Sequence, residues 1–299
     1  MRFVAKAALL LSAVVAACPA VAQSTLVARA KPCTIIQALP VVLDVPGRYC
    51  LDRDYSHAQG ATPITISASN VFLDCRHHRI SNQGGATFGM LLHPMYFTPG
   101  ITDTSVQRCK LSGFTEGIRI GGTDNALPEN KRLLIAENEI SGFTRGIHAA
   151  ATESRFIGNR LNGYRDPALE FQLHFGMELR PSCNSCLASD LQVQDNTIFN
   201  LRGSSDNTTG IVFFNAVRPQ IVGNRIYDLR PAFGSSATAF AGTGSDAIVA
   251  HNRFFARTAK NRLGGYAGLC ADNLAIGLDA TVLPVFSGCQ VQSNNVVRD

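Results

Sequence analysis

The sequence predicts an all-β solenoid of about eight stacked rungs that is stapled by disulfides. Three observations lead to this prediction. A strand–Asn–strand pattern recurs along the chain, a Gly followed by Ile or Met comes after five of these repeats at a limited set of distances, and the cysteines become even in number once a leader peptide is removed. Internal repetition of one strand-and-turn unit is the sequence signature of a solenoid, because each unit buries its apolar face only against its neighbours.

The repeating unit is clearest in residues 133–149. A short apolar strand, an Asn turn, a second short strand and a Gly-containing corner lead to a Gly-Ile pair that opens a third strand. The same Asn position recurs along the chain at Asn138, Asn159, Asn196, Asn224, Asn252 and Asn294. In two earlier repeats the position is held by Cys75 and Cys109. Intervals between successive positions range from 21 to 42 residues, which indicates a core unit of roughly 21 with insertions of variable length.

The first residues predict an export signal that covers residues 1–22. Arg2 and Lys6 give a basic start, residues 7–17 form an apolar run too short to span a membrane, and Ala-Val-Ala precedes the expected cleavage point. The protein is therefore expected to be secreted or periplasmic, without a transmembrane segment. Cys18 lies in a stretch that resembles a lipoprotein box, although Pro19 follows it, so a lipid anchor is the alternative to soluble export.

The cysteines of the exported chain are expected to form disulfides. Removal of Cys18 leaves eight of nine cysteines, and an even set in an oxidising compartment is typical of disulfides: Cys33, Cys50, Cys75, Cys109, Cys183, Cys186, Cys270 and Cys289. A Cys33–Cys50 disulfide would close the N-terminal end of the solenoid. Cys270 and Cys289 flank a long insertion before the last rung, which a disulfide between them would hold in place.

The Cys183–Cys186 pair is interpreted as a local loop disulfide. Zinc would need two further ligands, and a redox pair would need a helix N-terminus; neither is visible in the sequence. We expect no metal and no cofactor, with calcium left open but without a clear site. Removing Arg2 and Lys6 lowers the formal charge from +5 to +3, and no basic run or zinc-finger spacing indicates a nucleic-acid partner. A monomer is expected.

Residues 70–80 carry a resemblance to a known family. They read Asn-Val-Phe-Leu-Asp-Cys-Arg-His-His-Arg-Ile, which resembles the opening rung "N-V-x-L-D-x-x-x-H-x-I" of right-handed parallel β-helix proteins of the pectin-lyase-like superfamily, of the carbohydrate-binding and sugar-hydrolase repeat type. The resemblance implies a single-stranded right-handed parallel β-helix over residues 70–299, preceded by a cap and entry strands over residues 23–69. It specifies no activity, because the superfamily contains lyases, hydrolases, esterases, epimerases and proteins that are not enzymes.

In such a fold, equivalent residues of successive rungs stack upon one another. Adjacent strands lie ~4.8 Å apart, so the recurring Asn is expected to form an internal ladder of hydrogen-bonded amides. Cys75 and Cys109 occupy this position in consecutive rungs, at a spacing that suits a disulfide, and we pair them.

The Gly marks assign the residues of the third strand to its two faces. Each mark is a Gly followed by Ile or Met: Gly89, Gly117, Gly146, Gly176 and Gly210. Because side chains alternate along a strand, the residue two positions after each Gly is expected outside. This exterior column reads Leu91, Arg119, His148, Glu178 and Val212. The next exterior column reads His93, Gly121, Ala150, Arg180 and Phe214. We therefore expect one exposed polar patch, formed by Arg119, His148, Glu178 and Arg180.

This patch fits the cleavage of an acidic polysaccharide by β-elimination. The reaction needs a cation to neutralise the uronate carboxylate, a base to remove the C5 proton and an acid for the leaving oxygen. We hypothesise that His148 is the base and that Arg119 and Arg180 bind the carboxylate, with Glu178 as the acidic member of the catalytic set.

Inserted loops beside the same strand supply candidate substrate-binding residues. The distance from the Asn position to the Gly mark is 8 residues in two rungs and 14 or 17 in others. The insertion at 162–175 therefore rises beside the patch and brings Tyr164 and His174, while His93 and Phe214 come from the second exterior column. The role of the insertion at 257–288 stays open.

Two other functions fit the same residues. The first is a non-catalytic β-helix that binds a glycan or acts at a cell surface, in which the patch consists of ordinary surface charge pairs. The second is a glycoside hydrolase, although hydrolysis needs two facing carboxyl groups and the exterior columns supply Glu178 alone.

Overall fold

The structure is a computed structural model that describes most of the chain after residue 31. The described residues are 32–92, 100–121, 129–163, 174–181, 186–202, 207–230, 236–255, 262–263, 268–277 and 289–298. Residues 32–299 form one compact unit. The expected leader, His93, Tyr164 and Cys183 lie outside the described residues. Within the described part, no helix is long and apolar enough to cross a membrane.

The described chain is built from three parallel sheets, which we call A, C and B in the order in which each rung visits them. Sheet A contains β1 (Thr34–Ile35), β3 (Gly47–Cys50), β6 (Val71–Asp74), β9 (Ser105–Gln107), β13 (Leu134–Ala136), β16 (Arg155–Ile157), β20 (Gln192–Gln194), β23 (Gln220–Val222), β26 (Ala247–Ala250), β29 (Gly268–Ala271) and β31 (Val291–Ser293). Sheet C contains β4 (Tyr55–His57), β7 (Arg79–Asn82), β10 (Lys110–Ser112), β14 (Glu139–Ser141), β17 (Arg160–Asn162), β21 (Thr197–Phe199), β24 (Arg225–Tyr227), β27 (Arg253–Phe255), β30 (Leu274–Ile276) and β32 (Val296–Arg298).

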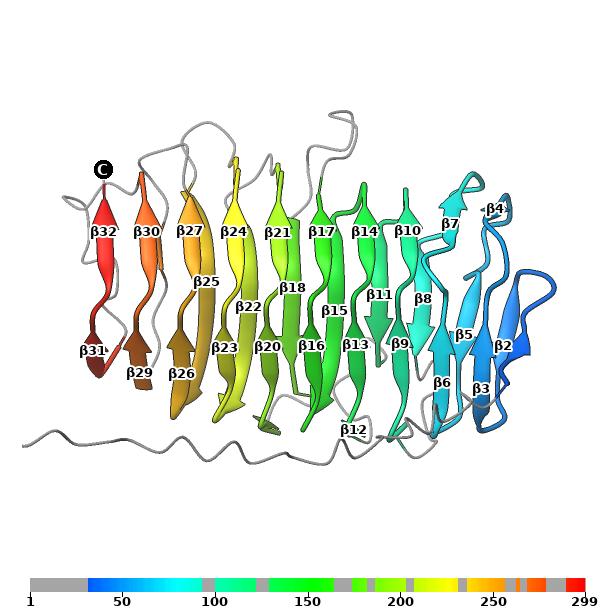
Figure 1. Ribbon diagram of the computed structural model, residues 1–299, viewed down its shortest axis with the longest axis horizontal. Helices are drawn as coiled ribbons and strands as arrows, with labels where there is room; N and C mark the ends of the chain where they lie inside the picture. The colour runs from blue at the N-terminus through cyan, green and yellow to red at the C-terminus, as the bar shows by residue number, and fades with distance from the viewer. Residues whose placement is uncertain are drawn as a thin grey trace, which may run out of the picture. The chain divides into compact units, whose positions relative to one another are not determined.

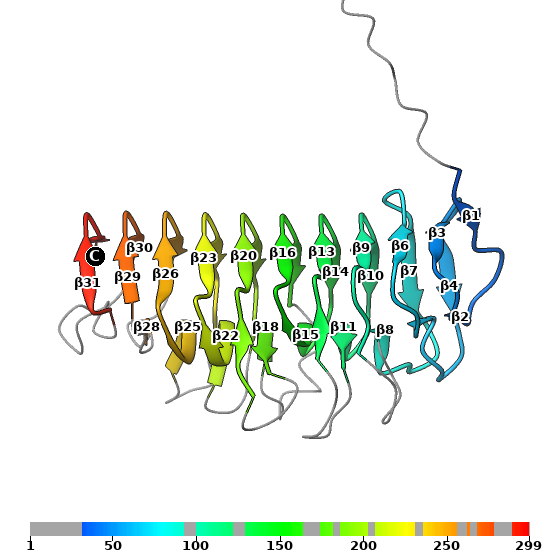
Figure 2. The same ribbon diagram turned by 90° about the horizontal axis from the view of Figure 1, so that it is seen from below.

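Sheet B contains the third strand of each rung and carries the predicted patch. Its strands are β2 (Val41–Leu43), β5 (Ile64–Ile66), β8 (Phe88–Leu92), β11 (Glu116–Ile120), β15 (Arg145–Thr152), β18 (His174–Arg180), β22 (Asn207–Val217), β25 (Ser236–Ser245) and β28 (Arg262–Leu263), with β12 (Asn130–Lys131) beside β15 and β19 (Ala188–Ser189) beside β22. Figure 1 shows the strands of sheets A and C following one another in chain order, and Figure 2 shows the strands of sheet B set apart from them.

This arrangement is a parallel β-helix, so the predicted fold class is confirmed. The estimate of about eight rungs was too low, because the described strands stack 11 deep in sheet A and 10 deep in sheet C. One reason is that β1 to β5 already stack within the segment assigned to the cap, residues 23–69. The other is a repeat near the C-terminus that the Asn pattern overlooked.

The Asn ladder explains that omission. From Asn138 onwards, each buried amide donates to the next at 2.9–3.0 Å, and the order is Asn138, Asn159, Asn196, Asn224, Asn252, Asn273 and Asn295. Asn273 was missed, and Asn295 rather than Asn294 occupies the ladder in the last rung. The residue before each ladder position has a left-handed backbone, as Asp272 (φ 52°) and Asn294 (φ 51°) do. Asn294 is therefore a turn residue, and the 42-residue interval is two rungs.

Disulfides hold the positions expected of them. Cys75 and Cys109 are bonded with their Cα atoms 4.7 Å apart, and the Cys109 amide donates to Asn138 Oδ1 at 3.0 Å, so the disulfide continues the ladder. Cys33–Cys50 and Cys270–Cys289 are also bonded. Cys186 is disulfide-bonded, while Cys183, its expected partner, lies outside the described residues.

Candidate functional site: a buried charged cluster on sheet B

The exterior column predicted from the Gly marks is present in sheet B. Arg119 is in register with Leu91 and His148, and Glu178 is in register with His148 and Val212. The residues on either side of His148, Ile147 and Ala149, belong to the hydrophobic core, so the imidazole lies on the outer face of the sheet. Arg180 follows Glu178 by two residues along β18 and is in register with Ala150.

Two charged residues that the sequence analysis did not include, Glu116 and Arg145, complete the cluster. They are in register with each other on β11 and β15, immediately before the Gly marks. Strict alternation would place Glu116 and Arg119 on opposite faces, yet their side chains meet at 3.1 Å. The strand departs from alternation at Gly117, where an added Cβ would lie 2.4 Å from Ile140 Cγ2 inside the core. The available sequence signal was the charged residue immediately before two of the five Gly marks, Gly117 and Gly146.

Salt bridges join these side chains across three strands. Arg145 connects two carboxylates, with Nη1 2.9 Å from Glu116 Oε1 and Nε 3.1 Å from Glu178 Oε2. Arg180 Nη2 lies 3.0 Å from Glu178 Oε1. Arg119 Nη1 lies 3.1 Å from Glu116 Oε2, and its Nε donates to the Gly121 carbonyl at 3.1 Å. Both carboxylates are therefore held by arginines.

His148 lies at the centre of the cluster. Arg180 Nε donates to His148 Nε2 at 2.7 Å, and a guanidinium group only donates, so Nε2 carries the lone pair. A neutral imidazole then has its proton on Nδ1, which lies 3.3 Å from Glu116 Oε2 and also contacts Arg119. Burial lowers the pKa of His148, and the charges of Arg119 and Arg180 lower it further against the opposing effects of Glu116 and Glu178. The imidazole is therefore neutral at pH 7.

The carboxyl group of Glu116 is ionised. Burial by itself favours the neutral acid, but the hydrogen bond with His148 and the charge and hydrogen bond of Arg119 outweigh it and lower the pKa of Glu116 to about 2. With a neutral His148, three arginines and two glutamates give the cluster a net charge of 3 − 2 = +1.

The prediction of an exposed patch was wrong for most of these residues. His148 is 2%, Arg119 4% and Glu178 7% exposed. In-register side chains on neighbouring strands lie only ~4.8 Å apart, so members of the cluster cover one another. The side chains of Arg145 and Arg180 are 31% and 37% exposed. The cluster therefore presents cations, and not its imidazole, to the solvent.

Of the other predicted site residues, the two that the structure describes, His174 and Phe214, do not surround His148. His174 is buried at the start of β18, and its neighbour Phe175 provides the contact with the cluster, with its ring centre 5.8 Å from the Arg145 guanidinium carbon. Phe214 is 42% exposed on β22. His93 and Tyr164 lie outside the described residues. Among the described residues, no group of three or more His, Cys, Asp or Glu side chains is arranged to hold a metal ion.

The fold and the site together define a disulfide-bonded parallel β-helix with a charged cluster on one outer face. No family model and no curated protein matches the chain. Among solved structures, the chain is similar to the surface protein and adhesin PfbA of Streptococcus pneumoniae, with a TM-score of 0.42 and 10% identity, over 86% of this chain and 83% of that chain. The fold assignment rests on the strand pairing of this chain itself, and the pectin-lyase-like superfamily remains a resemblance of residues 70–80.

Proposed function

We propose that the protein is an exported β-helix that binds an acidic polysaccharide on the outer face of sheet B without cleaving it. The observation that carries the proposal is the pair of partly exposed guanidinium groups, Arg145 and Arg180, on the neighbouring strands β15 and β18. Glu178 contacts both and fixes their orientation. Oriented arginines suit carboxylate and sulfate groups, because the planar guanidinium donates two parallel hydrogen bonds. The disulfides are typical of an oxidising compartment.

Binding is favoured over chemistry because of the state of His148. A general base must reach the proton that it removes, at a heavy-atom distance of about 2.6–3.2 Å. The imidazole is 2% exposed, and both its nitrogens contact members of the cluster. The groups of the cluster that meet the solvent are cations, which hold an anion but remove no proton at neutral pH.

Replacement of Arg180 tests the proposed binding. We expect Arg180→Gln to weaken binding to polygalacturonate or alginate by about tenfold at low salt, since one charge-assisted contact is lost. Isothermal titration calorimetry gives the affinity. The matched control is Arg218→Gln, which removes an exposed arginine that directly follows the end of β22, outside the cluster, and pairs with Asp190 at 2.7 Å. Equal effects of the two variants, or no binding of any uronic-acid polymer by the native protein, would refute the proposal.

Elimination is the second candidate function, and one observation favours it. His148 is neutral, and its lone pair faces a guanidinium group that a uronate carboxylate would engage. If the substrate draws Arg180 away, Nε2 accepts the C5 proton, the C4–O bond breaks, and its electron pair leaves with the oxygen, which is then protonated. A C4–C5 double bond forms in the same step.

Ultraviolet absorbance of the unsaturated product separates the two candidates. A lyase gives a rising absorbance with an acidic polysaccharide, and His148→Ala abolishes it. Binding of the polysaccharide without any increase in absorbance supports the non-catalytic function and excludes elimination. A hydrolase is not favoured, because a catalytic acid must keep its proton near neutral pH and the pKa of Glu116 is about 2.

A further inference from the structure

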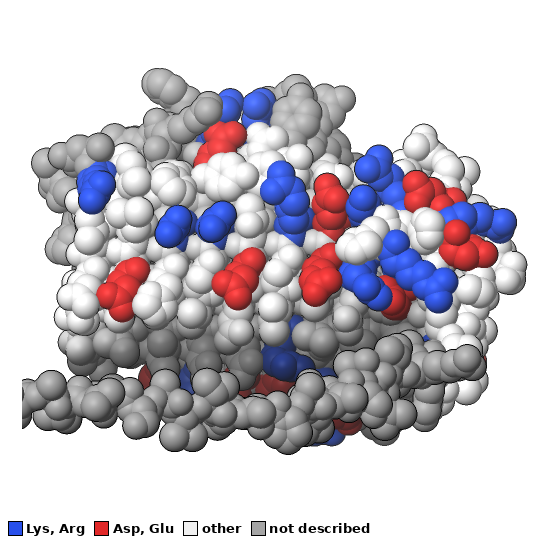
Figure 3. Space-filling model, viewed as in Figure 1, with Lys and Arg blue, Asp and Glu red and all other residues white. Residues whose placement is uncertain are grey.

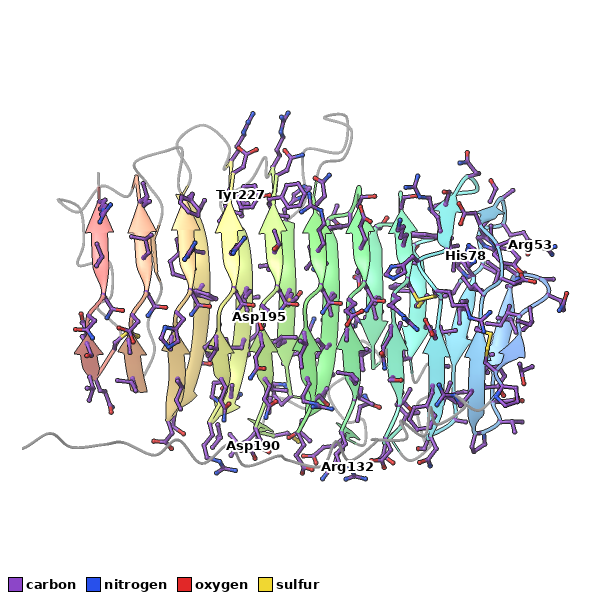
Figure 4. All side chains as sticks on the ribbon, in the orientation of Figure 1. Arg53, His78, Arg132, Asp190, Asp195 and Tyr227 are labelled. Carbon is purple, nitrogen blue, oxygen red and sulfur yellow. A yellow bond between two sulfur atoms is a disulfide. The ribbon has the colours of Figure 1, made fainter. Side chains whose placement is uncertain are left out.

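Sheet C carries a strip of aromatic side chains on its outer face. Phe199, Tyr227 and Phe255 are in register at the third position of β21, β24 and β27. The residues before them, Ile198, Ile226 and Phe254, are buried in the core, so the three aromatic residues point outward. The Phe199 and Tyr227 rings are stacked with centres 5.1 Å apart, and Phe255 is 39% exposed. Figure 4 shows Tyr227 at the end of β24.

A row of arginines runs beside this strip. Arg160, Arg225 and Arg253 occupy the first position of β17, β24 and β27, two residues before the aromatic column or its equivalent, and all three are exposed. Thr197 stands between Arg160 and Arg225 in the register. The Arg160 guanidinium carbon lies 4.5 Å from the centre of the Phe199 ring. Figure 3, in the orientation of Figure 1, shows basic side chains in a row over this sheet.

These arginines have no ion pair with any residue that the structure describes. Other exposed arginines of the chain do: Arg132 pairs with Asp103 and Arg218 with Asp190, each at 2.7 Å. The row ends at Glu139 on β14, whose carboxylate lies 4.0 Å from Lys110 Nζ. Between β17 and β27, the described part of sheet C therefore presents arginines without an ion pair next to apolar ring edges.

We propose that the outer face of sheet C from β17 to β27 is a second binding surface, which takes a linear anionic polysaccharide lying along the axis of the solenoid. Sugar rings pack on the strip formed by Phe199, Tyr227 and Phe255, and their carboxylate or sulfate groups bind the arginine row. The site goes beyond the proposed function, since it lies on another sheet and requires neither Arg180 nor His148.

The spacing of the two rows supports a repetitive ligand. Strands follow one another every ~4.8 Å along the axis, a step similar to one sugar unit of an extended polysaccharide. Two residues along a strand separate the aromatic and arginine rows by about 6.6 Å, a distance that long arginine side chains bridge. Apolar ring edges contribute contact area to the sugar, while guanidinium groups select an anion.

A pair of double variants with the same change in charge tests this surface. We expect Arg225→Gln/Arg253→Gln to weaken the binding of heparin and polygalacturonate by about tenfold or more, with an unchanged melting temperature. Arg132→Gln/Arg218→Gln removes the same two charges elsewhere and should change the affinity by less than about twofold. Phe255→Thr, which keeps a residue suited to a strand, should weaken binding even at high salt.

The outcomes separate the two surfaces and the competing ligands. If only Arg180→Gln loses affinity, the sheet B proposal is supported and the sheet C proposal is overturned. If only Arg225→Gln/Arg253→Gln loses affinity, the sheet C proposal is supported and the sheet B proposal is overturned. Equal weakening by the two double variants shows a general effect of charge and overturns the sheet C site. Single-stranded DNA that binds as tightly as heparin, with the same dependence on Arg225 and Arg253, would also overturn it in favour of nucleic acid. The absence of all polyanion binding overturns both proposals.

Discussion

At the scale of single residues, the functional properties of the site follow from charges packed closer together than they are on an ordinary surface. Glu116 is ionised because cations and the imidazole surround it, and His148 is neutral because it is buried among arginines. Both effects act on stability in the same direction. Each group has a lower pKa in the folded protein than its ordinary value, so the unfolded chain binds more protons and stability falls as the pH falls.

Glu116→Gln tests this coupling between charge and folding. The pKa of Glu116 lies at about 2 instead of 4.5, so its stabilisation is complete above about pH 5 and is lost as the pH approaches 2. We expect the variant to be less stable than the native protein by on the order of 2–3 kcal/mol at pH 7 and by much less at pH 3. Denaturant titrations at both values measure the difference. A loss of stability that is the same at pH 7 and pH 3 would contradict the assigned ionisation.

At the scale of the structural element, the Asn ladder is the device that keeps the rungs in register. Each ladder amide bonds a neighbouring amide and backbone groups, which satisfies polar atoms that the turn would otherwise bury without partners. Asn196 accepts from the Asn159 amide and backbone and donates to Phe156 O and Asn224 Oδ1 at 2.8–3.0 Å. The residue before it needs only a left-handed turn.

Two asparagine variants distinguish the ladder position from the turn position. Asn196→Ala should destabilise the protein by about 3 kcal/mol or more, because several buried hydrogen-bonding groups lose their partner. Asn294→Gly should cost less than about 1 kcal/mol, because glycine adopts the left-handed conformation of that turn without strain. Circular dichroism during denaturation gives both values. Similar losses in the two variants would show that the ladder has been assigned incorrectly.

At the scale of the whole molecule, the parallel β-helix turns local repetition into long surface columns. Every strand of a sheet contributes an equivalent position at a fixed spacing, so one residue type repeated in the sequence becomes a stripe in space. Sheet B uses this geometry to concentrate opposite charges into a cluster, whereas sheet C uses it to extend an arginine row and an aromatic strip. A ligand with its own repeat is the partner that such columns suit.

The register between neighbouring strands of sheet B was the part of the site that could be predicted from the sequence. The Gly marks correctly aligned Arg119, His148 and Glu178, because glycine recurs where neighbouring backbones approach too closely for a Cβ. The same Gly marks did not identify Glu116 and Arg145. Strict alternation assigns the residue before each Gly to the inner face, but alternation fails at the glycine itself. The aromatic strip of sheet C went unrecognised, although Phe199, Tyr227 and Phe255 recur at a regular interval of 28 residues, because only the third strand of each rung was assigned to inner and outer faces.

The sequence by itself determined the fold class, the disulfide at Cys75 and Cys109, and the order of residues in the exterior column, because all three depend on periodic backbone positions. The tertiary structure alone decided that His148 is buried and neutral, that Arg145 and Arg180 are the cations at the surface, and that Arg160, Arg225 and Arg253 share a face with aromatic rings. Burial and ionisation depend on the side chains of neighbouring rungs, and the spacing along one chain does not state how closely those side chains pack.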